Sequence, residues 1–173
     1  TNGDDSSAII TGSTALNFTT IADTTAPSVT FSPVSGATGV TASSNITLSF
    51  DEAIRHTDNS AITNTSVDAL ITLKDTNSSG SNIAFDSTIS GNVIIINPTG
   101  DFSSEQVVYV GIGASVEDDA DNAINAASAT ITVVDTQAPT VTFDPLNSVT
   151  GVSASANIVI TFSEAVRKIN NHS

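Results

Sequence analysis

The fold is decided by the stretch Asp23-Thr24-Thr25-Ala26-Pro27-Ser28-Val29-Thr30-Phe31, which recurs as Asp135-Thr136-Gln137-Ala138-Pro139-Thr140-Val141-Thr142-Phe143. Pro139 follows Pro27 by 112 residues. The similarity continues without a gap, because Asn45-Ile46-Thr47-Leu48-Ser49-Phe50 matches Asn157-Ile158-Val159-Ile160-Thr161-Phe162. Self-similarity at a fixed period indicates a repeated domain.

A weaker match connects the N-terminus with the region before the second linker. There, Asp4-Asp5 followed by Ala8-Ile9 resembles Asp118-Asp119 followed by Ala123-Ile124. We therefore predict three parts: residues 1–22 as the last strand or strands of a preceding module, residues 23–134 as a complete module, and residues 135–173 as the first strands of a following module.

Period-2 alternation of apolar and polar residues predicts half-buried strands in the complete module. Ile46, Leu48 and Phe50 alternate with Thr47 and Ser49. Residues 71–73 and 83–85 flank the turn-forming residues 77–80, which predicts a hairpin. The continuous apolar run 93–96 predicts a central strand covered on both faces, and residues 66–70 allow a single helical turn. About seven short strands predict an all-β, two-sheet sandwich of immunoglobulin-like type, repeated in tandem.

The chain is strongly acidic, with 18 acidic and 4 basic residues and a formal net charge of −14. Nucleic acid and anionic membranes both need a positive surface, so neither is an expected partner. There is no cysteine, and hence neither a disulfide nor a thiolate metal site. No apolar run approaches the length of a membrane span, so we expect no membrane insertion by these residues.

Catalytic chemistry has little support in the sequence. A Ser–His–Asp site needs an imidazole, and the two histidines, His56 and His172, lie outside any recognisable nucleophile motif. Tryptophan, which stacks on sugars in many carbohydrate-binding proteins, is absent. We expect a protein that is not an enzyme and that has no catalytic residues.

Several segments together resemble bacterial Ig-like repeats of the type found in S-layer proteins and large surface adhesins. They are the Asp-Thr-X-Ala-Pro linker, the turn Gly36-Ala37-Thr38-Gly39-Val40, the segment Phe162-Ser163-Glu164-Ala165-Val166, and Val107-Val108-Tyr109-Val110 leading to Asp121-Asn122-Ala123-Ile124. The chain departs from that pattern at Asp121, where such repeats commonly have glycine. The resemblance implies a secreted or cell-surface location and a modular, non-catalytic role. It identifies no adhesion ligand.

Two functions fit this resemblance. The first is a structural or adhesive repeat of a bacterial extracellular surface protein, acting as stalk, spacer or filament building block. The alternative is an accessory Ig-like module of a larger secreted enzyme. The number of repeats and the neighbouring domains in the gene would discriminate between them.

Acidic residues near the predicted module ends suggest calcium as a cofactor, since Ca²⁺ takes six to eight oxygen ligands. The candidate metal residues are Asp23, Asp118, Asp119, Asp121, Asn122 and Asp135. Two geometries are open: the acidic loop binds its own ion, or it meets the linker near Asp23. Glu52 and Glu164 also recur, each followed by an arginine three positions later, which suggests either a salt bridge or a cation ligand.

The predicted partners are neighbouring Ig-like modules. Apolar residues such as Ile158, Ile160 and Phe162 lack the rest of a sandwich within residues 135–173, and open strand edges pair readily with other chains. We therefore also expect strand complementation by another copy, through its N-terminal strand around Leu16 and Phe18. Such a contact is heterologous and can propagate into a filament.

Overall fold

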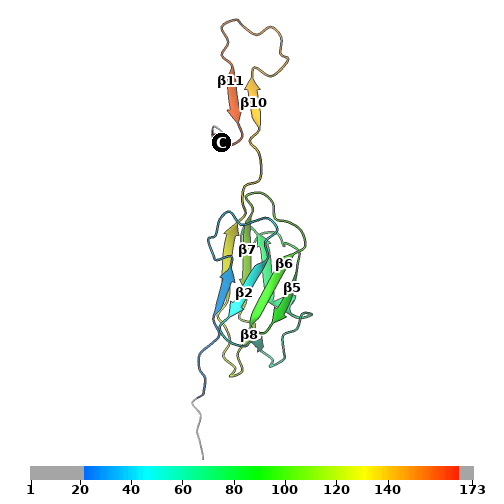
Figure 1. Ribbon diagram of the computed structural model, residues 1–173, viewed down its shortest axis with the longest axis vertical. Coiled ribbons are helices and arrows are strands. Elements are labelled where there is room, and N and C mark those ends of the chain that lie inside the picture. Colours follow the sequence, from blue (N-terminus) through cyan, green and yellow to red (C-terminus); the bar gives the residue numbers. More distant parts are fainter. Residues whose placement is uncertain (1–21, 168–173) are drawn as a thin grey trace, which may run out of the picture.

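Seven strands form two antiparallel sheets that face each other in the computed structural model, which describes residues 22–167 (Figure 1). The first sheet has the order β1-β2-β6-β5, made of Val29–Ser32, Ile46–Phe50, Val93–Pro98 and Phe85–Ser90. The second has the order β4-β7-β9, made of Ile71–Asp75, Val107–Ile112 and Ala127–Thr132. The predicted all-β, two-sheet architecture is therefore present in this part of the chain.

The core lies between the two sheets and follows the alternation in the sequence. Ile46 and Leu48 of β2 are fully buried, and Phe50 is 3% exposed. Val108 of β7 and Ile131 of β9 are fully buried as well. Because successive side chains of a strand point to opposite faces, one apolar residue in two is enough to line this interior.

The predicted hairpin forms over a short length, and the chain then changes sheet. Around the turn at residues 77–80, Lys74 bridges Asn82, and the amides of Ile83 and Asp75 donate to the oxygens of Leu73 and Ser81 at 3.0 and 2.9 Å. β4 then pairs with β7, and β5 pairs with β6 over six residues. The alternation showed that both segments are strands, whereas the choice of partner depends on distant segments. Gly80 is required in this turn, since a Cβ there would lie 1.6 Å from the Asp75 carbonyl oxygen.

β6 is central in its sheet but is covered on one face only, which corrects the second expectation. Ile94 and Ile96 are fully buried, whereas Ile95 between them is 41% exposed. No described segment forms a layer outside this sheet. The apolar run therefore reflects a strand with neighbours on both edges, and not one with layers on both faces.

One end of the sandwich is closed by short elements. β3 (Arg55–His56) pairs with β8 (Val116–Glu117), and the 3₁₀ helix η1 (Val67–Leu70) forms within the predicted single turn. Asp68 of η1 accepts a 2.8 Å hydrogen bond from the Ser87 amide of β5. None of the helical segments within residues 22–167 has the length and hydropathy of a membrane span.

The third part of the chain forms a separate hairpin of β10 (Val141–Asp144) and β11 (Val159–Phe162), beyond the end of the sandwich opposite β8 (Figure 1). Its register repeats that of β1 and β2, since Val141 lies opposite Phe162 as Val29 lies opposite Phe50. The predicted strand around Leu16 and Phe18, and His172, lie outside the described residues.

Candidate functional site

Three carboxylates converge at the end of the sandwich that carries β8. Oxygens of Asp23, Glu52 and Asp118 lie within 4.8 Å of one another. Asp23 belongs to the linker before β1, Glu52 follows the end of β2, and Asp118 follows the end of β8. We call these three residues the acidic pole. The sheets bring together side chains that are far apart in the sequence.

Asp118 is held in place by the turn that follows it. It is 2% exposed, and its Oδ1 accepts 2.8 Å hydrogen bonds from the amides of Ala120 and Asn122. Hydrogen bonding by Asn122 is the main reason that the pKa of Asp118 is lowered. Asp121 completes the turn with a φ of 67°, in the left-handed region that glycine adopts most readily. That conformation accounts for the glycine expected at this position.

The pKa of Glu52 is shifted in the opposite direction from that of Asp118. Its pKa is raised, first by burial and then by the charges of Asp118 and Asp23. Ionisation of Glu52 is therefore disfavoured at this pole. A bound cation would offset the repulsion among the three groups, because it favours the charged forms.

Arg55 contacts the other acidic residues of the loop, and not Glu52. Its Nε lies 3.2 Å from Glu117 Oε1, and its Nη2 lies 2.6 Å from Asp121 Oδ1. Nη1 is 3.9 Å from Asp119 Oδ1. Two of the predicted metal residues, Asp119 and Asp121, thus face a guanidinium, and the three-carboxylate group does not include them.

Asn122 connects the acidic loop to the linker. Its Nδ2 donates to Asp118 Oδ2 at 2.8 Å and to the Asp23 backbone oxygen at 3.3 Å. Of the two geometries left open by the sequence, the structure has the one in which the loop meets the linker near Asp23. Glu52, whose recurrence as Glu164 left it between a salt bridge and a cation ligand, lies with Asp23 and Asp118.

Asp135 lies at the other end of the sandwich, where the chain leaves for the hairpin. It accepts 2.9 Å hydrogen bonds from Ser104 Oγ and from the Gln137 amide, which lower its pKa. The pKa of Glu164 is raised by burial and by the charge of Asp135. At the linker that follows the sandwich, Asp135 therefore raises the pKa of Glu164, as Asp23 raises that of Glu52 at the linker before it.

A serine and a histidine also approach each other. His56 Nε2 lies 3.1 Å from Ser66 Oγ, and Ser66 Oγ also accepts from the Thr63 amide at 3.0 Å. Among the described residues, no carboxylate is hydrogen-bonded to the other ring nitrogen. The pair lacks the third group of a catalytic triad. Its hydrogen bonds instead connect β3 with the loop that precedes η1.

A family model for the bacterial Ig-like domain matches residues 23–133. The chain belongs to this family. Domains of the family are generally non-catalytic binding or structural modules, and they occur in surface or extracellular bacterial proteins.

One solved structure, that of CopC from Methylosinus trichosporium OB3b, aligns with 62% of this chain and 92% of its own length. The identity is 13% and the TM-score is 0.40. No curated protein matches the chain in sequence.

The acidic pole of the Ig-like module fits a hard cation by the chemistry of its donors. Its three side chains offer only carboxylate oxygens, the ligands that Ca²⁺ prefers. Asp118 is fixed by hydrogen bonds to the turn, and Glu52 and Asp23 lie on segments adjoining strands. Three carboxylates supply part of the required coordination, so water or further oxygens would complete it.

Proposed function

We propose that this chain is a run of Ig-like modules that serves as a non-catalytic stalk, spacer or filament building block of a bacterial extracellular surface protein. The observation that carries the proposal is the second hairpin, β10–β11, with the register of β1–β2 at an interval of 112 residues. A module that begins again directly after the first one ends is the arrangement expected of a tandem array.

The joint between the modules supports a stiff connection. Ser104 Oγ donates to Asp135 Oδ1 at 2.9 Å and accepts from the Thr136 amide at 2.8 Å, which fastens the linker to the end of the sandwich. Pro139 fixes its own φ and disfavours helical geometry at Ala138. The linker is therefore fixed at its start and conformationally restricted along its length.

Calcium at the acidic pole is the cofactor that we propose for this role. The pole lies where the chain enters the module, beside the linker that contains Asp23. An ion shared by Asp23 of the linker, Glu52 and Asp118 would hold that linker against the body of the module. Removal of the linker's freedom is what a load-bearing stalk needs.

Small-angle scattering of a protein with several tandem copies of residues 23–134 tests the proposal. We expect a rod whose maximum dimension grows in proportion to the number of copies. Ser104→Ala in every copy removes the side-chain contact with the linker, so its profile should show greater flexibility. A collapsed profile whose dimension does not grow with copy number would contradict the stalk function.

A further inference from the structure

An open hollow lies on the outer face of the sheet β4-β7-β9. It has a volume of about 240 Å³, and its lining includes Thr72 of β4, Tyr109 and Gly111 of β7, and Ser128 of β9. Val110, between Tyr109 and Gly111, is fully buried in the core. Because successive side chains of a strand point to opposite faces, the hollow belongs to the outside of the sandwich. We call it the outer hollow.

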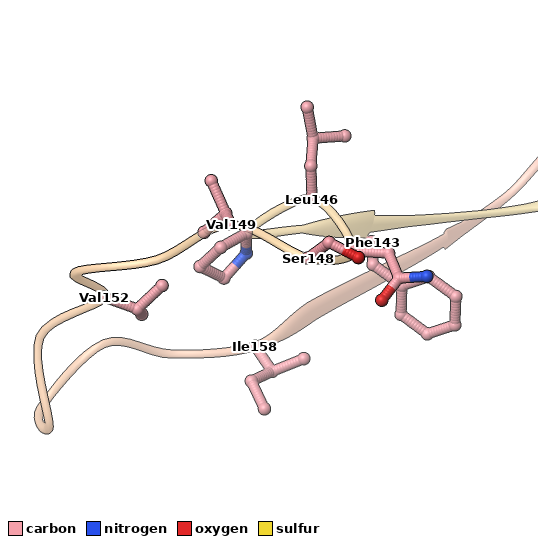
Figure 2. A pocket seen from close by; sticks show the side chains of 8 residues that line it. Phe143, Leu146, Ser148, Val149, Val152 and Ile158 are labelled. Atoms are coloured by element: carbon pink, nitrogen blue, oxygen red, sulfur yellow. The ribbon is translucent and has the colours of Figure 1, made fainter.

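The larger hollow beside the β10–β11 hairpin has a different origin. Its volume is about 460 Å³, and Phe143 and Ile158 are among the side chains that line it (Figure 2). Their counterparts in the complete module, Phe31 and Ile46, pack in the hydrophobic core. That lining is therefore the inward side of a sandwich and not a binding surface, whereas the outer hollow lies on a sandwich whose two sheets are both present.

The ring of Tyr109 lies over Gly111 at the edge of the outer hollow. A Cβ added to Gly111 would lie 3.0 Å from the Tyr109 hydroxyl oxygen and 3.2 Å from the ring atom Cε1. Gly111 is buried although it occupies an outward position of β7, because the ring covers it. Glycine within a strand is destabilising, and it is typical of a place that another group approaches closely. Tyr109 itself is only half-buried, so part of its ring remains open to solvent.

Polar groups surround this ring. Two rows of outward residues, in register, cross the sheet here: Lys74, Tyr109 and Thr130, and then Thr72, Gly111 and Ser128. Residues directly opposite each other on adjacent strands have Cβ atoms about 4.5–5.5 Å apart. An ammonium group and several hydroxyls, which donate and accept hydrogen bonds, therefore lie within reach of a molecule placed on the ring.

Lys74 gives this face a positive charge in an acidic chain. The formal net charge of the chain is −14, yet none of the outward residues of β4, β7 and β9 is acidic. Asp75, next to Lys74, alternates to the other face and accepts a 3.4 Å hydrogen bond from Gln106. All ion pairs within the described part of the chain involve Arg55, so Lys74 has none there. More distant carboxylates are screened over about 8 Å at physiological ionic strength, which leaves Lys74 to attract a carboxylate locally.

We propose that the outer hollow binds a hexuronate unit of an acidic polysaccharide. The C–H groups of the pyranose would lie on the negative face of the Tyr109 ring, and the sugar carboxylate would accept a charge-assisted hydrogen bond from Lys74. Thr72 and Ser128 would bond to the sugar hydroxyls. The hollow is smaller than the roughly 300–1,000 Å³ of sites that enclose a drug-sized ligand, so it holds one unit of a longer chain. This ligand goes beyond the stalk function, which does not depend on it.

The fluorescence of Tyr109 reports on this site directly, because the chain has no other tyrosine and no tryptophan. The whole 173-residue chain is titrated with trimers of galacturonate, glucuronate or mannuronate, in EGTA so that no Ca²⁺ reaches the acidic pole or the sugars. We expect a saturable change of emission with at least one uronate trimer, weakened by added salt. The neutral trimers of the same linkage are the matched probes and should give no saturable change. The absence of binding by all three uronates, or equal binding of a neutral trimer, would overturn the proposal.

A pair of charge variants tests the contact with the carboxylate. Lys74→Gln leaves the core untouched and should weaken uronate binding about tenfold, since it removes a hydrogen bond between charged groups. Arg167→Gln is the matched control, because it removes the same charge from an exposed position after β11 and should leave the affinity unchanged. Equal affinities of the Lys74 variant and the unaltered chain would contradict the assignment.

A pair of ring variants, measured by titration calorimetry, tests the stacking. Tyr109→Phe keeps the ring and should retain binding, whereas Tyr109→Leu should lose it. The thermal unfolding of both variants shows that the sandwich is folded. Uronate binding by a folded Tyr109→Leu chain would overturn the proposal. The scattering rod of the tandem protein does not involve this face, so a rod without uronate binding would leave the stalk proposal standing.

Discussion

The two hairpins of this chain, β1–β2 and β10–β11, have the same backbone and opposite surroundings. In both, a threonine hydroxyl of the first strand donates to a backbone oxygen of the second: Thr30 to Ser49 at 3.2 Å, and Thr142 to Thr161 at 3.5 Å. Yet Ile46 is fully buried, and its counterpart Ile158 is 75% exposed. Local sequence thus specifies the register of the hairpin, whereas the other strands of the sandwich provide its burial.

The difference has an energetic consequence. A two-stranded hairpin is marginally stable at best in water, because its side chains gain little from burial. β1–β2 gains that burial from β6 on its edge and from the facing sheet β4-β7-β9. Among the described residues, β10–β11 has neither a further strand on its edge nor a facing sheet.

Truncating the paired isoleucines gives the largest expected contrast. Ile46→Ala should lower the free energy of unfolding of the sandwich by about 2–5 kcal/mol, since it leaves a cavity in a closed core. Ile158→Ala should change it by less than about 0.5 kcal/mol, because the side chain is exposed. Urea unfolding followed by the fluorescence of Tyr109, the single tyrosine, measures both in dilute protein. Equal losses would mean that the hairpin is buried in solution.

Calcium binding should distinguish the acidic pole from the linker that contains Asp135. If the acidic pole binds Ca²⁺ in the folded state only, the ion raises the free energy of unfolding by about 2.7 kcal/mol at a hundredfold excess over Kd. The unfolding midpoint rises as a result. Glu52→Gln should reduce this shift. Glu164→Gln is the matched control, since the described residues place no counterpart of Asp118 beside Glu164, and it should leave the shift intact. Calorimetry with Ca²⁺ and then with excess EGTA gives the answer, and an unchanged midpoint in the unaltered chain would exclude the ion.

The smallest expected effect is the pH dependence of Glu52 without calcium. Because its pKa is raised in the fold, Glu52 contributes stability below its unfolded pKa of about 4.3 and loses that contribution as the pH rises through the folded value. Glu52→Gln should therefore raise the midpoint in EGTA at neutral pH, and the gain should vanish near pH 4. Asp118 has a lowered pKa, so its contribution is present at neutral pH and lost in acid. A pH-independent difference between the Glu52 variant and the unaltered chain would contradict this assignment.

Part of the candidate site was readable from the sequence. Asp23 and Asp118 were predicted from acidic residues near a linker and a turn, and they do lie together. Glu52 was left between two interpretations, because a sequence does not show that Arg55 points to Glu117 and Asp121. Asp119 and Asp121 belong to the same acidic run as Asp118, but the turn that follows Asp118, left-handed at Asp121, places them beside Arg55.

The sequence by itself determined the strands, the linkers and the period of this protein, because alternation, proline and turn residues act within a few positions of one another. It determined in the same way that β10–β11 would repeat β1–β2. Only the tertiary structure decided that β4 pairs with β7 and β5 with β6, that Ile95 faces outward, and that Asp23, Glu52 and Asp118 meet. Those outcomes depend on contacts between segments tens of residues apart. Such contacts form where burial and hydrogen bonding of the whole sandwich outweigh the entropy of closing long loops.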